Sequence, residues 1–542
     1  MKPSWSWSWP WLLTMALLRA GATTGCGVHV NVLEASSNSP CGVAANPVDT
    51  SRPDTVVGDG TPDNCSEDTL NMALETGGII RFRCGANPLT INVTAEKVIS
   101  RDTVIDGGNT ITLDGGGKSR LFVLGAPGGR PASLTLQYLT LRRGYATITP
   151  ASAGAPSRAG GGAVLQFGGS LIITDSVLRD SDASATGPDE SGGAVCSLGG
   201  RLVIARSLFD GNRAGSGGAV AAIGTELTFL RVQLTNNQAV GQGSGAEGIG
   251  GALLVSQQGQ SVGMCQVAMS GNQATTFGTA MHLQGIGGEP MTIEQASFLD
   301  NLAPESSSSS GGPAVFLGIV SARLTSVTVA GNQGPLNPGV WVNGGVQPTQ
   351  TATIAFTNVT IAQNRVYQHS DPTSDGVGAA LWIEGVVRGE IINSTLAGNL
   401  GEFGSGIVHP GQLVVRNTII SNQGTNVGTA QNCSDLGTPT IPAGGDRVLQ
   451  WPPESVSSYL CVADATLADP MLGPLQDNGG FAPTMMPAAT SPAVGSGADC
   501  PSTDARGHAR PSRCTLGAIE ADGTVGGCPS CGLLDAAVSD SQ

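Results

Sequence analysis

The sequence predicts an all-β fold built as a parallel β-solenoid, and three observations lead to it. The 542 residues include 80 glycines and 32 prolines, while charged residues make up 12% and aromatic residues 4%. Two short motifs recur along the chain, and short apolar runs lie between them. Helical bundles are excluded because glycine costs about 1 kcal/mol at a helical position, and collagen because glycine follows no strict triplet.

Charge and apolar content narrow the function classes further. The chain has 26 Lys and Arg against 41 Asp and Glu, and this formal net charge of −15 repels a nucleic-acid backbone. Apolar residues make up 40%, which is enough to bury a large core and excludes disorder. We therefore expect a folded protein with no nucleic-acid partner.

Residues 1–25 have the pattern of a secretory signal peptide. A basic start precedes an apolar stretch at 11–18 and a small-residue cleavage site at Ala20-Gly21-Ala22. No later segment is apolar for long enough to cross a bilayer, so we expect export and no transmembrane segment.

Residues 26–57 are expected to form an N-terminal leader. Cys26 allows two interpretations: lipidation after signal cleavage, or a disulfide with a partner such as Cys41. The sequence alone leaves both open.

Residues 58–88 are expected to cover the N-terminal end of the solenoid, because an open end exposes a row of unpaired backbone groups. Residues 66–75 (SEDTLNMALE) are the best helix candidate of the chain, with Ser66 as N-cap. A disulfide between Cys65 and Cys84 would join this helix to the next strand.

The coils of the solenoid are expected over residues 89–423, where the two motifs repeat. The first is a Gly-Gly-Ala step into an apolar residue, with its clearest copies at Gly161, Gly192, Gly217 and Gly250. The second is an apolar residue, two spacers and an asparagine, namely Asn212, Asn237, Asn272, Asn301, Asn332, Asn364, Asn399 and Asn422.

Both motifs are interpreted as structural. The asparagines follow one another at intervals of 25, 35, 29, 31, 32, 35 and 23 residues, which correspond to single coils with insertions. Because coils stack about 4.8 Å apart, equivalent asparagines should form a ladder of side-chain amides. Asparagine also tolerates the left-handed backbone of a corner, and glycine suits bends where a Cβ would collide with the next strand.

Twelve cysteines in an exported chain predict disulfides. Their spacing indicates local pairs, namely Cys65/Cys84, Cys433/Cys461, Cys500/Cys514 and Cys528/Cys531. Cys196 and Cys265 lie within the repeats and are expected to be free, buried thiols. Zinc is not expected, because histidine is scarce and no two C-x-x-C pairs face each other at ligand spacing.

The paired motifs resemble the repeats of polymorphic outer-membrane proteins, which residues 209–212 (FDGN) and 298–301 (FLDN) match literally. Residues 57–108 are similar to the opening coils of the same exported proteins. The region 424–520 resembles the choice-of-anchor Q domain, and the matching stretches are 472–480, 491–494, 503–507, 510–511 and 516–520.

This resemblance implies a pectate-lyase-like, right-handed parallel β-helix with a helical N-terminal cap and a non-repetitive C-terminal capping region. It further implies a bacterial protein that is displayed on the cell surface or shed from it. Residues 521–542 are expected to be a flexible tail without a sorting signal, which leaves lipidation at Cys26 or free secretion as the routes.

The same resemblance extends to polysaccharide lyases and glycoside hydrolases, which need clustered carboxylates. Here the acids of the repeats are scattered, and no lysine follows Lys118. The densest region spans residues 365–409, where exposed tryptophan beside acidic groups would suit a sugar. The weak candidates for a carbohydrate site are Trp341, Arg365, His369, Asp371, Asp375, Trp382 and Glu384. His282 and His409 are expected to be packing or turn residues.

We therefore predict a non-enzymatic secreted or cell-surface protein with an adhesive, binding or envelope-structural role. Its partners would be surface glycans or envelope components, and no cofactor is expected. The alternative is a carbohydrate-active enzyme, a polysaccharide lyase or glycoside hydrolase, with calcium only in the case of a lyase. An enzyme should bring acids and a base from adjacent coils together in one groove.

Overall fold

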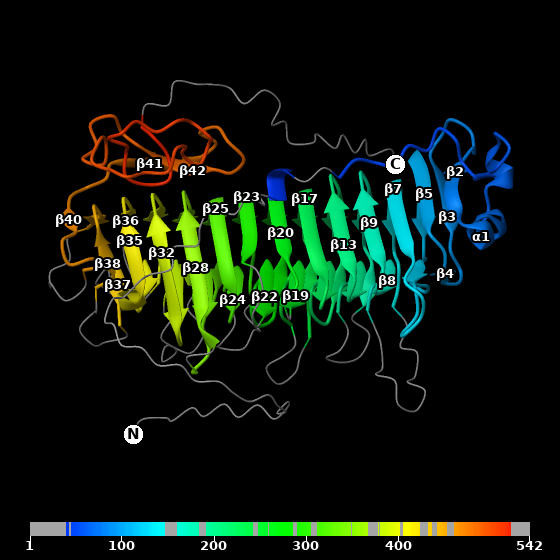
Figure 1. Ribbon diagram of the computed structural model, residues 1–542, viewed down its shortest axis with the longest axis horizontal. Coiled ribbons are helices and arrows are strands. Elements are labelled where there is room, and N and C mark those ends of the chain that lie inside the picture. Colours follow the sequence, from blue (N-terminus) through cyan, green and yellow to red (C-terminus); the bar gives the residue numbers. More distant parts are fainter. Residues whose placement is uncertain are drawn as a thin grey trace, which may run out of the picture. The chain divides into compact units, whose positions relative to one another are not determined.

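The computed structural model describes residues 40–42, 45–146, 160–183, 191–241, 248–257, 259–285, 290–304, 312–347, 350–366, 378, 380–401, 405–422, 432–435, 442–452 and 460–521. These residues form a right-handed parallel β-helix, as the sequence predicts (Figure 1). Cys26, Cys528 and Cys531 lie outside the described residues, so the lipidation alternative and the last cysteine pair stay predictions.

Two long sheets and several small ones make up the solenoid, and strands of successive coils pair in parallel. The 22-stranded sheet contains β1 (Thr55–Val57), β2 (Gly78–Phe82), β3 (Leu89–Asn92), β5 (Thr103–Asp114), β7 (Ser133–Arg142), β9 (Ser170–Thr174), β10 (Val177–Arg179), β13 (Arg201–Ala205), β14 (Leu208–Asp210), β17 (Glu226–Thr235), β20 (Val262–Ser270), β23 (Met291–Leu299), β25 (Ser321–Ala330), β28 (Ala352–Thr357), β29 (Thr360–Ala362), β32 (Val387–Ile392), β33 (Thr395–Ala397), β35 (Leu413–Arg416), β36 (Ile419–Ser421), β38 (Gly444–Asp446), β39 (Leu449–Trp451) and β40 (Thr466–Leu467).

The 12-stranded sheet contains β4 (Lys97–Ile99), β6 (Phe122–Leu124), β8 (Val164–Phe167), β12 (Val195–Leu198), β16 (Val220–Ile223), β19 (Leu253–Gln257), β22 (Met281–Gly285), β24 (Val315–Gly318), β27 (Val340–Asn343), β31 (Leu381–Glu384), β34 (Ile407–Val408) and β37 (Cys433–Ser434). Smaller sheets join β11 (Asp182–Ala183), β15 (Arg213–Ala214), β18 (Gln238–Ala239) and β21 (Gln273–Ala274); β26 (Gln333–Gly334) and β30 (Arg365–Val366); and β41 (Leu472–Gln476) and β42 (Thr484–Pro487).

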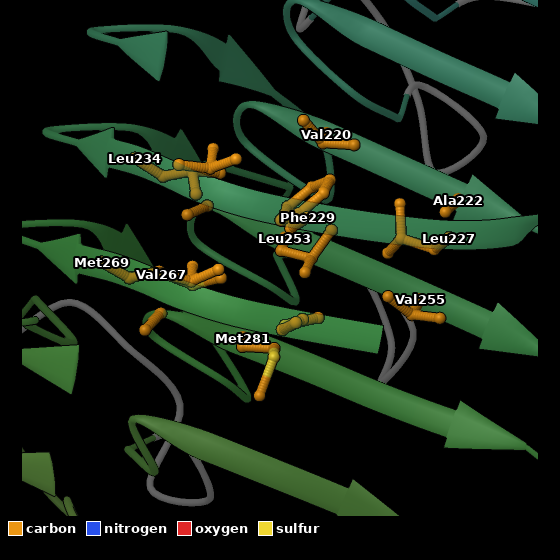
Figure 2. Close-up of a cluster of buried hydrophobic side chains, with 14 of the residues drawn as sticks. Val220, Ala222, Leu227, Phe229, Leu234, Leu253, Val255, Val267, Met269 and Met281 are labelled. Atoms are coloured by element: carbon orange, nitrogen blue, oxygen red, sulfur yellow. The ribbon is translucent and has the colours of Figure 1, made fainter. Parts of the chain in front are cut away.

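The inward side chains of these strands form a continuous apolar core. Figure 2 shows part of it, where Phe229, Leu253 and Met281 from β17, β19 and β22 point into the same interior. All three are fully buried. Complete burial of such a side chain stabilises the fold by about 1.5–3 kcal/mol, so the repeated core is the main source of stability.

The asparagine motif forms the predicted ladder. The side-chain amide of Asn272 donates to Oδ1 of Asn301 at 3.0 Å, and the backbone N–H of Asn272 donates to the same oxygen at 2.9 Å. The amide also donates to the carbonyl of Leu234 at 2.9 Å. This pattern continues through buried members, namely Asn212, Asn237, Asn272, Asn301, Asn332, Asn364, Asn399, Asn422 and Asn432.

The left-handed residue at this corner is the one before the ladder asparagine, which corrects the expectation that the asparagine itself turns the chain. Asn236, Gly271 and Asp300 have φ values of 56°, 65° and 54°. This explains why Gly, Asn or Asp so often precedes the ladder residue, since these types tolerate positive φ.

The Gly-Gly-Ala step also acts as predicted. Gly250 has a φ of 68°, and a Cβ there would lie 2.4 Å from the carbonyl oxygen of Leu253. A Cβ on Gly251 would lie 1.9 Å from the carbonyl oxygen of Thr279 in the next coil. Both positions therefore require glycine for steric reasons.

The N-terminal helix forms as α1 (Glu67–Thr76), which is capped by Ser66 in a capping box with Thr69. Leu70 and Ala73 bury its inner face. Short 3-10 turns occur at Pro40–Gly42, Pro62–Asn64 and Pro410–Gln412. The predicted disulfides Cys65–Cys84, Cys433–Cys461 and Cys500–Cys514 are present.

Residues 40–42 and 45–50 of the leader lie against the outer face of the 22-stranded sheet, where a disulfide fastens them. Cys41 bonds to Cys265, so the predictions of a free thiol at Cys265 and of a Cys26–Cys41 pair are both wrong. Alternation in β20 places Met264 inward and Cys265 outward, where the leader reaches it. Further along, Gln137 exchanges two hydrogen bonds with the backbone of Val48.

The C-terminal region does more than end the solenoid. Its strands β38 to β40 continue the 22-stranded sheet, and its later residues pack against the side of earlier coils. Asn358 of the coils donates to the carbonyl of Thr503 at 2.9 Å, and Asn393 donates to that of Thr515 at 3.2 Å. The region therefore covers outward side chains of the last coils, for example Ile419.

A buried ion network holds this region together. Arg506 pairs with Asp504 at 2.7 Å, and Arg510 pairs with Glu520 at 2.6 Å. Arg510 also donates to Oδ1 of Asn358 at 3.0 Å, which joins the network to the β-helix. These acids and arginines all lie within residues 504–520.

Candidate functional site

The outer face of the 12-stranded sheet carries one column of side chains whose character changes along the axis. In its first half the column is aliphatic or small, with Leu165, Cys196, Ala221 and Leu254 at successive register positions. From β22 onward the column becomes aromatic, with His282, Phe316, Trp341 and Trp382 in register. Because outward positions of a solenoid sheet usually face water, this aromatic half requires a separate explanation.

The aromatic half is a stack of rings. His282 and Phe316 stack at 4.5 Å between centroids, and Trp341 and Trp382 stack at 4.9 Å, each pair within 10° of parallel. Phe277, which precedes β22, contacts both Phe316 and Trp341 at 5.4 Å. Trp341 is only 7% exposed, whereas Trp382 at the end of the stack keeps partial exposure. The accessible aromatic surface is therefore that of Trp382.

Polar groups surround this accessible end. Glu384 lies two residues after Trp382 on β31, and Asn343 of β27 donates to its Oε2 at 3.3 Å. Burial among the neighbouring residues raises the pKa of Glu384, and the indole N–H of Trp341 and the charge of His409 oppose the rise. Glu384 still contacts solvent, so a ligand could reach its carboxylate.

His409 and Asp435 form a second polar element beside Glu384. Nδ1 of His409 lies 3.0 Å from Oδ1 of Asp435, and the histidine side chain is 35% exposed while the aspartate is 9% exposed. His409 has a φ of 58°, so it is also a turn residue, as predicted. The aspartate orients the ring, since its carboxylate engages Nδ1 and leaves Nε2 as the other ring nitrogen.

The two indole N–H groups of the stack lack a well-formed hydrogen bond among the described residues, although that of Trp341 lies near enough to Glu384 to lower its pKa. The indole nitrogens of Trp341 and Trp382 are buried, and neither makes a hydrogen bond of acceptable geometry with the described residues. Buried polar groups normally have a partner. The groups that a ligand can reach are Glu384, Asn343 and His409, which provide donors and acceptors of the kind that sugar hydroxyls need.

The structure brings together part of the predicted carbohydrate site. Trp341, Trp382 and Glu384 occupy adjacent positions on the 12-stranded sheet. Arg365 lies on β30, in a two-stranded sheet with β26, and so belongs to another face of the coil. His369, Asp371 and Asp375 lie outside the described residues, and their membership of the site stays a prediction.

Sequence reasoning missed Asp435 and Asn343. Asp435 lies past the end of the recognisable repeats, and Asn343 sits on the second outward position of β27, one coil before Glu384. The strand register could have indicated Asn343. Aligning Trp341 with Trp382 in neighbouring coils places Asn343 directly opposite Glu384. His282 is buried in the stack, as its packing role predicts, and burial lowers its pKa to about 4.

No group of histidine, cysteine and acidic residues in the described ranges is arranged to hold a metal ion. Likewise, none of the helices in those ranges has the length and apolar character needed to cross a bilayer. In comparisons with known proteins, no protein-family model matches the chain and no curated protein is significantly similar to it.

Proposed function

We propose that this protein is a secreted or cell-surface β-helix protein without catalytic activity, which binds glycans through the face defined by Trp382, Glu384, Asn343 and His409. The observation that carries the proposal is the partly exposed end of the aromatic stack at Trp382, ringed by hydrogen-bonding groups. Tryptophan with a few placed polar groups is the usual composition of a site that binds an amphipathic ligand such as a sugar.

The wider architecture supports a role in display. Four disulfides within the described residues are typical of exported proteins. The resemblance of the repeats to those of polymorphic outer-membrane proteins, and of the C-terminal region to the choice-of-anchor Q domain, agrees with a bacterial surface or secreted location. A rigid solenoid presents its lateral face to a partner without conformational change.

The alternative is a carbohydrate-active enzyme, and one observation favours it. A carboxylic acid with a raised pKa, here Glu384, is the pattern of a general acid. Glycosidases generally use a pair of carboxylates, and the nearby Asp435 is held by His409. We therefore place binding ahead of catalysis.

The test is a binding titration of the purified exported protein against neutral, amino and uronic-acid oligosaccharides, followed by calorimetry. We expect affinity for at least one glycan, and the substitution Trp382→Ala should weaken it at least about tenfold, as loss of a central aromatic contact does. The matched control is Phe167→Ala, which removes a partly exposed aromatic residue from β8 on the same sheet, away from the cluster.

Reducing ends and unsaturated uronide absorbance are followed in the same mixtures, with and without calcium. Product release that Glu384→Gln abolishes would replace the binding proposal with the enzyme alternative. Absence of binding to the whole panel, or equal losses in the Trp382 and Phe167 variants, would refute the glycan site.

A further inference from the structure

Most carboxylates that the fold encloses are matched by a cation from the same chain. Asp114 contacts Arg142 at 2.7 Å and pairs with Arg143, and these hydrogen bonds hold its pKa below the usual value despite burial. Glu67 pairs with Lys97, and its pKa is lowered to about 2.

The same holds at the other end of the chain. Asp504 pairs with Arg506, and Glu520 pairs with Arg510, inside the C-terminal region. A carboxylate removed from water needs such compensation, because desolvation alone disfavours its charged form. The enclosed acids named above are therefore compensated from within the chain and have no charge left to offer a ligand.

Glu384 is a different case, because its side chain is exposed at the end of the aromatic stack and is only partly desolvated by its neighbours. Within the described ranges, no arginine or lysine lies within ion-pair distance of its carboxylate, and its polar neighbours are the amide of Asn343 and the indole of Trp341. The sequence has no lysine after Lys118, so a lysine cannot reach the site from any later part of the chain. His409 is the one basic side chain that acts on Glu384, and it is engaged by Asp435.

Acidic groups also outnumber basic ones beside Glu384, where His409 is the one basic side chain among the described residues. Asp435 adds a second carboxylate next to the site, and the chain as a whole carries a formal net charge of −15. A uronic acid placed against Trp382 would bring a third negative charge, which like-charge repulsion disfavours. A cationic ligand would instead place an attractive charge beside the Glu384 carboxylate.

On the basis of the proposed glycan-binding function, we propose that this site selects amino sugars with free amines, and that the ammonium group of the ligand pairs with Glu384. The ammonium donates to the Glu384 carboxylate while the sugar ring lies against the exposed part of Trp382. Charge-assisted hydrogen bonds of this kind are about twice as strong as neutral ones. The Trp382 ring also favours a nearby cation.

The experiment compares two short oligosaccharides that differ only in charge: glucosamine oligomers with free amines and the same oligomers N-acetylated. Calorimetry at neutral pH and moderate salt should show about tenfold tighter binding of the free-amine form, as expected for one charge-assisted contact. The substitution Glu384→Gln should bring the two ligands to within about twofold of each other, because it removes the charge and keeps the shape.

The matched control is Glu226→Gln, which removes the same charge from an exposed position on the 22-stranded sheet, where Glu226 lies 3.6 Å from Arg201. This variant should keep the full preference for free amines. A general attraction of cations to an acidic protein would persist in Glu384→Gln, so a preference that survives this substitution overturns the inference.

The two proposals fail in different ways. Equal affinity of the wild-type protein for both ligands overturns the amino-sugar inference but leaves glycan binding in place. Binding of neither ligand, together with no response to the wider panel, removes the glycan site itself. Tighter binding of uronic-acid oligomers than of free-amine oligomers also overturns the inference.

Discussion

Two side-chain columns run along the same solenoid, and they differ in how their residues vary from coil to coil. The buried corner repeats asparagine from Asn212 to Asn432, and the steps from Asn212 to Asn422 use the same three hydrogen bonds. The outer column of the 12-stranded sheet changes from small aliphatic residues to rings between Leu254 and Trp382.

This difference teaches how to separate structure from function in a repeat protein. A position that holds the same residue in every coil serves the stacking of the coils, because each side-chain amide needs an identical neighbour above and below. A position that departs from its own repeat over a few coils has lost that constraint. The change from aliphatic to aromatic residues thus marks the part of this face where we place the ligand site. The aromatic residues are His282, Phe316, Trp341 and Trp382.

The largest expected effect comes from breaking the invariant column. Asn301→Ala removes the oxygen that accepts two hydrogen bonds from Asn272, and the amide that donates to Met269 and Asn332. Since several buried polar groups lose their partner, we expect a loss of about 4 kcal/mol in the free energy of unfolding. Urea denaturation measures this loss, and hydrogen exchange should locate it at the adjacent coils.

The control for this variant is Asn236→Gly at the left-handed residue beside the ladder. Asn236 is exposed with a φ of 56°, which glycine adopts freely. The Asn236→Gly substitution should lower the free energy of unfolding by less than about 1 kcal/mol. Similar losses in both variants would mean that the corner, and not the amide ladder, supplies the stability.

A smaller effect is expected from the compensated carboxylate that contrasts with Glu384. Arg510→Ala leaves Glu520 buried without its cation and removes the bond to Asn358. We expect a local loss of about 3 kcal/mol, as for one broken partner of a buried pair, which hydrogen exchange of residues 498–518 would report. Arg513→Ala, at an exposed arginine, is the control, and equal exchange in both variants would contradict the assigned role of the network.

The smallest expected effect on stability depends on pH and concerns His282, the first ring of the aromatic stack on the 12-stranded sheet. The pKa of His282 is lowered to about 4 by burial, from an ordinary value near 6.5. As the pH falls, His282 is therefore protonated in the unfolded chain before it is protonated in the folded protein. Its contribution to the free energy of unfolding is fully present above pH 6.5 and is lost progressively toward pH 4. At pH 4.5 the titration of His282 should lower the free energy of unfolding by about 2.5 kcal/mol.

His282→Phe should remove this part of the pH dependence, because phenylalanine continues the stack and does not titrate. Urea midpoints at pH 7.5 and 4.5 for both proteins give the comparison. An unchanged acid loss in the variant would show that His282 is not a buried neutral ring.

Much of the fold could be predicted from local patterns. Helix α1, its capping residue Ser66, the asparagine ladder and the glycine bends each depend on residues close in sequence or repeated at coil spacing. The disulfide Cys65–Cys84 follows for the same reason, since a short segment joins its ends.

Other features could not be predicted, because they depend on which face of the sheet a side chain points to and on which distant segment packs against that face. Cys265 sits one residue after inward Met264, and only the path of the leader brings Cys41 to it across 224 residues. The fold of the C-terminal region against earlier coils likewise depends on contacts such as Asn358 with Thr503.

The sequence by itself determined that this protein is a parallel β-solenoid, because short-range periodicity specifies turns, inward faces and the coil-to-coil ladder. The tertiary structure alone decided that Asn343, His409 and Asp435 join Trp341, Trp382 and Glu384, and that no described arginine or lysine pairs with Glu384. Insertions of variable length separate these residues along the chain. Their proximity arises only when the coils stack in register and bring distant segments together at the spacing of neighbouring strands.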